Sequence, residues 1–125
     1  MHTLTGDNYT RRVHIQRIID GDTIVADVID LGYHVQTTAG IEYRLLRINC
    51  PETNRPASRA AGLVAKQYTV AWLLEHVLHD PDGWLYATTQ KTDSFGRYLA
   101  SITCGQQHDL SDDLLATGHA VVYKR

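Results

Sequence analysis

The sequence has few of the residues that cross-link or stiffen a chain, and it has no long apolar run. It contains two cysteines, Cys50 and Cys104, and three prolines among 125 residues. Two cysteines allow at most one disulfide, which excludes a small domain held together by several disulfides. No apolar run approaches the roughly 18 residues that a membrane-spanning helix requires, and the polar opening residues lack the basic and apolar regions of a secretory signal. We therefore expect a cytoplasmic protein with reduced cysteines and no membrane partner.

The sequence also lacks an excess of positive charge. Twelve Lys and Arg residues stand against fourteen Asp and Glu residues, for a formal net charge of −2. This balance excludes a protein that coats nucleic acid by charge alone. The length and the 43% hydrophobic content suit one compact globular domain. An anionic ligand would therefore have to bind at a local site, and the clustering of Arg44, Arg47, Arg55 and Arg59 in one short stretch permits such a site.

The first half of the chain has the pattern of a strand meander. Residues 1–10 have no sustained period, and we expect them to be a flexible lead-in. Apolar and polar residues then alternate in four segments that predict strands, at residues 13–20, 23–31, 33–38 and 41–48. Asp20-Gly21 is typical of a hairpin turn between the first two strands, and Ala39-Gly40 predicts a turn between the last two. In the fourth strand, Tyr43 and Leu45 would share one face while Arg44 lies on the other.

The second half mixes helices with short strands. After a proline-bounded loop at residues 51–57, apolar residues recur at helical spacing and predict a helix of roughly twenty residues with Ser58 as its N-cap. The stripe expected to pack on the sheet consists of Ala60, Val64, Tyr68, Ala71, Leu74 and Leu78. The remaining predicted elements are strands at residues 85–89 and 99–103, a short helix at 109–117 that stops at Gly118, and an extended segment at 121–123. The elements together predict a small barrel or an α+β domain.

Three clusters of polar side chains lie in turns between these apolar segments. Residues 20–23 read Asp-Gly-Asp-Thr, residues 44–52 run from an arginine to Pro-Glu, and residues 93–97 read Asp-Ser-Phe-Gly-Arg. Carboxylate and amide oxygens suit a hard cation, arginines suit a phosphate, and a spare carboxylate can act as a base. Each cluster alone is explained more simply by a hairpin turn, a surface ion pair or a solvated loop. Only their combination indicates metal-assisted phosphoryl transfer or hydrolysis.

In this order, the clusters and their flanking segments resemble the staphylococcal nuclease (thermonuclease) family. The matching segments are residues 13–23, 43–52, 93–100 and 114–123, which together span nearly the whole chain. The resemblance implies a single domain over residues 11–125, of α+β or mainly β class. Its fold would be an OB-fold-like five-stranded barrel packed by one long and one short helix. Family members commonly continue into a third helix beyond the position of Lys124-Arg125, so we expect either a minimal domain or self-association.

The resemblance further implies an enzyme that hydrolyses phosphodiester bonds of DNA and RNA with little sequence specificity. Its cofactor would be Ca²⁺, with Mn²⁺ or another hard divalent cation as an alternative. Glu52 matches the carboxylate usually drawn as the general base, and Arg44 and Arg97 match the two phosphate-binding arginines. Phe95 and Tyr123 match positions that help to hold the substrate.

The implied metal ligands are the Asp22 carboxylate, the Asn49 amide oxygen and the backbone carbonyl of Cys50, with Asp20 supporting them from the same turn. Asn49 stands where the family has a second carboxylate. The loss of one negative charge predicts weaker Ca²⁺ binding.

Three other interpretations remain open at this point. The chain is alternatively a catalytically weak or inactive OB-fold module that binds nucleic acid or a protein; the retention of Glu52 with both arginines favours the enzyme. A barrel that binds polysaccharide or peptide would leave the carboxylates and arginines unexplained.

His76 and His79 lie three residues apart, but no third nitrogen or sulfur ligand is evident nearby, so we expect a solvated helix end rather than a zinc site. The Cys50 thiol is expected to be buried and inert.

Overall fold

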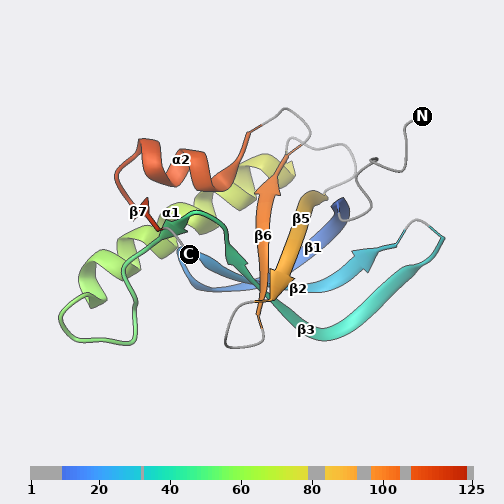
Figure 1. Cartoon of the computed structure of the whole chain (residues 1–125), viewed down its shortest axis with the longest axis horizontal. Helices are drawn as coiled ribbons and strands as arrows, with labels where there is room; N and C mark the ends of the chain where they lie inside the picture. Colours follow the sequence, from blue (N-terminus) through green and yellow to red (C-terminus); the bar gives the residue numbers. More distant parts are fainter. Residues whose placement is uncertain (1–9, 32, 79–83, 93–96, 105–107, 124–125) are drawn as a thin grey trace.

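The computed structural model describes residues 10–31, 33–78, 84–92, 97–104 and 108–123. Within this part of the chain, five strands close a barrel in the order β1-β2-β3-β6-β5 (Figure 1). The barrel strands are β1 (Thr10–Asp20), β2 (Thr23–Asp30), β3 (Val35–Leu45), β5 (Leu85–Thr92) and β6 (Tyr98–Thr103). Strands β3 and β6 run parallel, and the other pairs are antiparallel. The five-stranded barrel predicted from the sequence is confirmed.

The first two strands form the predicted hairpin. Asp20 pairs with Thr23, so Gly21 and Asp22 occupy the turn between β1 and β2. Strand β1 begins at Thr10, the last residue of the predicted lead-in, and residues 1–9 lie outside the described part of the chain. This hairpin brings the Asp-Gly-Asp-Thr motif to one end of the barrel.

The predicted turn at Ala39-Gly40 is wrong, because β3 runs through both residues without a break. Ala26 of β2 pairs with Ile41, whereas Val28 pairs with Thr37, so β3 advances four residues where β2 advances two. Gly40 has a φ of +130°, a conformation that glycine adopts at little cost. The glycine therefore accommodates an irregularity inside one long strand instead of ending it.

The strand predicted to reach residue 48 ends at Leu45. A turn at residues 46–47 follows, in which Arg47 has a φ of 70°, and a residue in this left-handed region does not continue a strand. The chain then forms β4 (Ile48–Asn49), which pairs with β7 (Val121–Val122) in a separate two-stranded sheet. The backbone N–H of Tyr123 donates to the Arg47 carbonyl at 2.8 Å and extends this pairing.

The long helix α1 (Arg59–Leu78) has the predicted bounds, and Ser58 directly precedes it. The predicted apolar stripe is wrong: Val64 is 52% exposed and Leu74 is 59% exposed. The face that packs inward instead carries Ala65, Thr69, Trp72 and Leu73, all buried. Small side chains fill the N-terminal part of this face, where α1 approaches the backbone of neighbouring segments, and large apolar side chains mark only its later part.

The short helix α2 (Leu110–Ala116) confirms the second predicted helix. The Asp109 side chain caps its N-terminus by accepting from the Asp112 N–H at 3.1 Å. Gly118, with a φ of 79°, follows its last turn as predicted. Leu110 and Leu114 are fully buried and attach α2 to the core.

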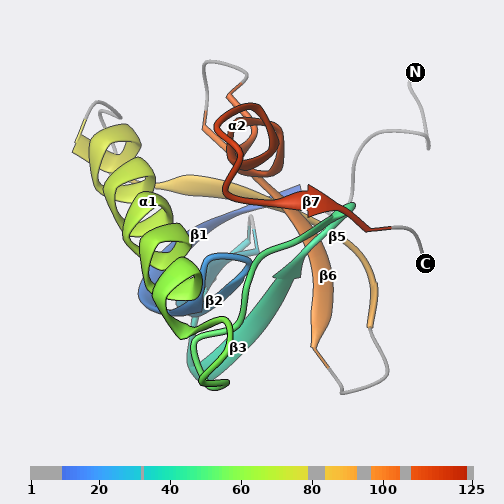
Figure 2. The same cartoon turned by 90° about the vertical axis from the view of Figure 1, so that its left-hand side faces the viewer.

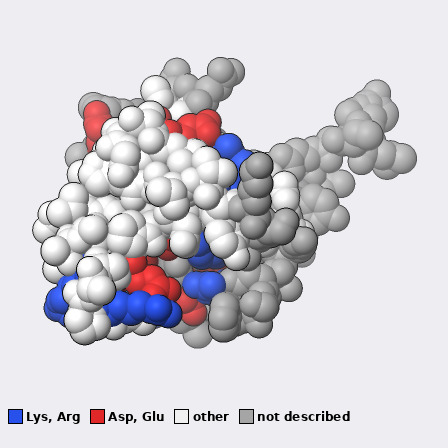
Figure 3. All heavy atoms as spheres, turned by 60° about the vertical axis from the view of Figure 1, so that its left-hand side comes forward, with Lys and Arg blue, Asp and Glu red and all other residues white. Residues whose placement is uncertain are grey.

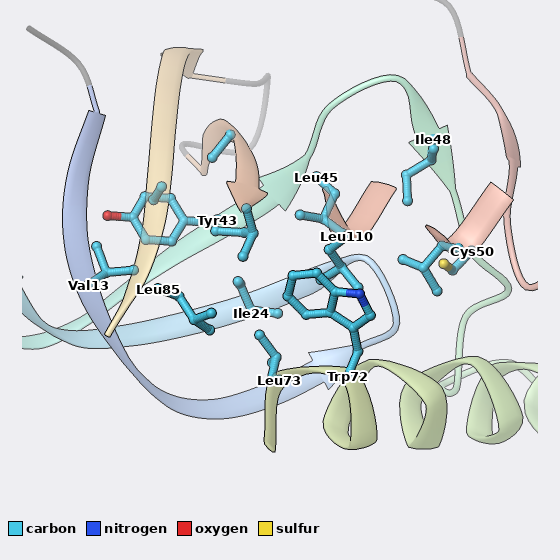
Figure 4. Packing of buried hydrophobic residues seen from close by; sticks show 14 of the residues in the cluster. Val13, Ile24, Tyr43, Leu45, Ile48, Cys50, Trp72, Leu73, Leu85 and Leu110 are labelled. Atoms are coloured by element: carbon cyan, nitrogen blue, oxygen red, sulfur yellow. The ribbon is translucent and has the colours of Figure 1, made fainter. Parts of the chain in front are cut away.

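The core lies between the barrel and the two helices, which occupy the side opposite the outer part of the β2–β3 hairpin (Figures 1 and 2). Helix α1 contacts β1 and α2, and α2 contacts β6. Figure 4 shows Trp72 extending from α1 toward Ile24 and Leu110, with Cys50 and Ile48 at one end of the same cluster. Neither helix, over the residues described, is apolar and long enough to cross a bilayer.

Candidate functional site

The carboxylate of Asp22 is the point at which the site's segments meet. It is 5% exposed and accepts the Cys50 backbone N–H at 2.7 Å and the Thr23 hydroxyl at 3.2 Å. The Arg44 guanidinium lies 3.1 Å from the same carboxylate. A buried carboxylate is stable only when it is paired or hydrogen-bonded. These bonds therefore tie the β1–β2 turn to the segment that follows β4.

Arg44 connects Asp22 to Asn49. Its Nη2 atom, 3.1 Å from Asp22 Oδ2, also donates to Asn49 Oδ1 at 2.7 Å, and its Nη1 atom donates to the Leu45 carbonyl at 3.1 Å. The Arg44 side chain is buried, so these partners fix the direction of its guanidinium. Three of the residues predicted for the site are thus in direct contact.

Glu52 lies in the loop that follows β4, beside this cluster in sequence. Its carboxylate is 2.6 Å from the Arg55 guanidinium, and its side chain is 49% exposed. The Ser58 hydroxyl donates to the Glu52 backbone carbonyl at 2.8 Å. Thr53, the next residue, donates to Asp20 Oδ1 through its hydroxyl at 2.7 Å and its N–H at 3.1 Å. The loop is therefore held at several points while the Glu52 carboxylate reaches solvent.

Helix α1 packs against both the β1–β2 turn and the loop that carries Glu52. The Thr69 hydroxyl donates to the Gly21 carbonyl at 2.7 Å. A Cβ atom on Gly21 would approach Ala65 Cβ to 3.0 Å, and a Cβ atom on Gly62 would lie 2.8 Å from the carbonyl group of Glu52. Glycine is required at Gly62, where a Cβ atom would collide with the Glu52 backbone, whereas a Cβ atom at Gly21 would be tight and would need Ala65 to shift slightly. The β1–β2 turn and the Glu52 loop thus rest on one face of α1.

The Cys50 thiol is buried beside the site, as expected. Burial is the main cause that raises the pKa of this thiol from 9.0 to about 12; the neighbouring Asp22 carboxylate contributes in the same direction, and Arg44 opposes the change. A thiol with this pKa stays protonated at neutral pH and is a poor nucleophile. Both cysteines are free and buried, so only the Cys50 backbone enters the predicted site chemistry.

The positions of Arg97 and Tyr123 follow from the strands that lie next to them in the chain. Arg97 directly precedes β6, in which Leu99 pairs with Arg44, so the backbone of Arg97 lies near the strand that carries Arg44; residues 93–96 lie outside the described part of the chain. Tyr123 follows β7, whose Val121 pairs with Asn49, and its side chain is exposed. Phe95 lies outside the described residues.

The three predicted metal ligands are all oxygen donors: a carboxylate, an amide and a backbone carbonyl. This is the donor chemistry that a hard cation accepts, so the residues fit Ca²⁺ in kind. They supply one formal negative charge, and Arg44 already neutralises it by pairing with Asp22. Over the described stretches, no three His, Cys, Asp or Glu side chains gather closely enough to hold a metal by themselves. A cation held by these residues would therefore meet little net negative charge.

Charges of both signs lie side by side on this face of the molecule. Figure 3 shows acidic and basic side chains together along its lower part, next to a broad area that carries neither. Of the two ion pairs of the site, Glu52–Arg55 lies at the surface and Asp22–Arg44 is buried. A surface of mixed charge suits local binding of a phosphate better than long-range attraction of a polyanion.

Sequence reasoning did not identify Thr53, Gly62 or Thr69, which position the site, and it named Arg55 only as one of the clustered arginines. None lies in a recognisable motif of its own, because each acts through a contact to a residue that the motifs do identify. Gly62 could have been identified from the sequence, because a glycine inside a helical pattern often marks a close packing contact.

Comparison with known proteins agrees with the geometry. The model of the family described as staphylococcal nuclease homologue matches residues 42–125, more than half of the chain. This stretch contains Arg44, Asn49, Glu52 and Arg97, while the Asp20–Asp22 turn precedes it. No curated protein matches the chain. The barrel and the family match together support a nuclease-like or nucleic-acid-binding domain. The chain belongs to the staphylococcal nuclease homologue family.

Proposed function

We propose that this chain is a metal-dependent nuclease that hydrolyses phosphodiester bonds of DNA and RNA with little sequence preference, with Ca²⁺ as the preferred cation and Mn²⁺ as the alternative. The observation that carries the proposal is the contact of Arg44 with two partners, the buried carboxylate of Asp22 and the exposed Asn49. A guanidinium, a carboxylate and an amide oxygen are held together there, next in the chain to a loop whose Glu52 carboxylate reaches solvent.

A phosphodiester carries a negative charge that repels an attacking hydroxide, so its charge must be offset before hydrolysis proceeds. In the proposed mechanism, Arg44 and Arg97 bind the phosphate oxygens and stabilise the charge that grows on them during attack. Glu52 orients a water molecule and accepts its proton. These contacts are made to the phosphate backbone of the nucleic acid. Because the backbone carries no sequence information, the enzyme would have little sequence preference.

Asp22, Asn49 and the Cys50 carbonyl would hold the cation. When bound, Ca²⁺ would supply positive charge to the phosphate and lower the pKa of a coordinated water. Asp20, held by Thr53, would keep the turn that carries Asp22 in place. The cation would be attracted only weakly, because Arg44 neutralises Asp22 and position 49 carries an uncharged amide.

A second function, binding of nucleic acid without cleavage, is favoured by one observation. Arg44 donates to the Leu45 carbonyl and to Asn49 while pairing with Asp22, and the Glu52 carboxylate pairs with Arg55. Groups committed to protein partners must exchange those partners before they take part in hydrolysis. A domain in which they did not exchange would bind a strand on its barrel without cutting it.

Digestion of single-stranded DNA, duplex DNA and RNA with Ca²⁺, Mn²⁺ or chelator separates the two functions. Glu52→Gln should lower the cleavage rate by about 10²-fold or more, the usual contribution of a general base. The matched control is Glu75→Gln, an exposed position toward the other end of α1, which should leave the rate unchanged. Lack of cleavage by the folded wild-type protein with every cation would reject the nuclease. Retained binding of single-stranded DNA would then support the second function.

A further inference from the structure

His76 and His108 lie side by side at a place remote from the site described above. His76 belongs to the last turns of α1, and His108 lies just before α2. Their ring centroids are 5.3 Å apart. Along the axis of α1, His76 is about 21 Å from Gly62, which contacts the Glu52 loop. His76 lies at the helix end as expected and is partly buried there; His79 lies outside the described residues.

The hydrogen bonding of His76 fixes which ring nitrogen is available. Its Nδ1 atom is 2.7 Å from the backbone carbonyl of Trp72. A carbonyl only accepts hydrogen bonds, so Nδ1 must carry the proton and Nε2 of the neutral ring has a free lone pair. Histidines that bind metals commonly have this arrangement, with the second nitrogen donating to a carbonyl or carboxylate. The Trp72 ring, 4.0 Å away between centroids, restricts the orientation of the imidazole further.

The position of His108 is set by the neighbouring backbone. Its carbonyl accepts the Cys104 N–H at 3.1 Å, and the next residue, Asp109, caps α2. His108 is exposed, and its ring lies next to the His76 ring with the two planes tilted by 50°. One imidazole therefore comes from a rigid helix and the other from the anchored start of a second helix.

The spacing of the two rings matches shared coordination of one ion. Zinc–imidazole bonds of about 2.0–2.1 Å and a tetrahedral angle place the centroids of two bound rings about 5 Å apart. The observed separation is 5.3 Å. Imidazole ligands suit Zn²⁺, Ni²⁺ and Cu²⁺ and are not the oxygen ligands that Ca²⁺ prefers.

We propose that His76 and His108 form a binding site for a divalent transition-metal ion of the zinc class, separate from the Ca²⁺ site. Within the described ranges no third His, Cys, Asp or Glu joins them, so this part of the chain supplies two imidazole ligands, and an ion held by two ligands exchanges readily. The bound ion links the C-terminal part of α1 to the connection between β6 and α2. Its effect is stabilisation of the contact between the two helices, and nuclease activity does not depend on it.

The test is calorimetric titration of tag-free protein with Zn²⁺, in the absence of nucleic acid and with Ca²⁺ present in excess. The wild type should show a binding event that Ca²⁺ does not displace, and His76→Asn and His108→Asn should each weaken it at least tenfold. His34→Asn, at an exposed histidine that contacts Tyr33, is the matched control and should bind like the wild type. Unchanged affinity in both site variants, or no wild-type binding at 1 mM Zn²⁺ (about the weak limit of a specific site), would overturn the proposal.

Thermal unfolding gives a second readout. Zn²⁺ at ten times its dissociation constant should raise the unfolding midpoint by about 5 °C in the wild type and in His34→Asn. His76 packs on Trp72, so its replacement can disturb the core, whereas His108 is exposed and its replacement tests the ligand alone. An equal rise in His108→Asn would contradict the proposal. Because no measurement here involves cleavage, the outcome is independent of the proposed nuclease function.

Discussion

Thr53 holds the carboxylate of Asp20 with two hydrogen bonds, from its hydroxyl at 2.7 Å and from its backbone N–H at 3.1 Å. The two residues are distant in sequence, and the contact joins the end of β1 to the loop that carries Glu52. A short bond to a charged oxygen is stronger than an ordinary one and is directional. The relative position of Asp20 and Glu52 therefore depends on a threonine that carries no catalytic chemistry.

Thr53→Val keeps the shape of the side chain and removes its hydroxyl, so Asp20 loses the shorter of the two bonds. The free energy of unfolding should fall by about 1–2 kcal/mol. If Glu52 is the general base, the loop shift should lower kcat about tenfold with little change in KM. Thr53→Ser retains the hydroxyl and should restore most of kcat. Equal kcat values for the valine variant and the wild type would show that this bond does not position the loop.

Asn49→Asp replaces the amide that accepts from Arg44 with a carboxylate. The added negative charge should strengthen Ca²⁺ binding about tenfold, because the affinity of oxygen sites for this cation follows the number of charged ligands. Isothermal titration calorimetry measures the change. Asn54→Asp adds the same charge at an exposed position in the neighbouring loop and should alter the affinity much less. If the two variants behave alike, position 49 does not hold the cation.

Leu73 and Leu74 are adjacent on α1 but differ in environment. Leu73 is 5% exposed and Leu74 is 59% exposed. Leu73→Ala should therefore cost about 2–5 kcal/mol of unfolding free energy through a core cavity, whereas Leu74→Ala should change it by less than about 0.5 kcal/mol. Urea denaturation of the two variants compares identical chemistry one residue apart. A larger cost at Leu74 would mean that α1 packs through its other face.

Tyr43 should make the fold sensitive to alkali. Burial raises the pKa of its hydroxyl from 10.0 to about 12, with a smaller contribution from Tyr98. Above pH 10 the unfolded chain loses this proton while the folded chain keeps it, so stability falls as pH rises from 10 toward 12. Below pH 10 the contribution is fully present.

Tyr43→Phe removes this titration, and the loss of stability between pH 9 and 11 should shrink by about 1 kcal/mol relative to the wild type. Denaturant unfolding at several pH values measures the difference. Tyr33→Phe, at an 82% exposed position, is the matched control. If the unfolding free energy of the Tyr43 variant fell with pH as steeply as that of the wild type, the Tyr43 hydroxyl would be excluded as the cause of the alkaline loss of stability.

Local signals in the sequence predict the parts of the fold that local physics determines. The Asp20-Gly21 turn follows from the conformational freedom of glycine next to aspartate, and α1 follows from apolar periodicity after a proline-bounded loop. The same logic fails at Gly40. Pairing along the whole length of β3 outweighs the local preference of Ala39-Gly40 for a turn.

The buried face of α1 was mispredicted for a related reason. Hydrophobic size identifies the face that contacts other side chains, but much of α1 packs against backbone, where Gly62 and Ala65 fit and leucine does not. Contacts between distant segments are also invisible to sequence periodicity. The contact of Asp22 with Arg44 was predictable only through the family resemblance, and that of His76 with His108 was not predictable at all.

Gly62, Ala65 and Thr69 follow one another on a single face of α1 and contact both segments that carry the site. The helix is thus a common reference for the Asp22 turn and the Glu52 loop, and a displacement of α1 moves both together. The outer part of the β2–β3 hairpin, around Asp30 and Val35, lies on the opposite side of the barrel. The hairpin can therefore be lengthened or replaced, or a second domain can be fused to it, without a change in the geometry of the site.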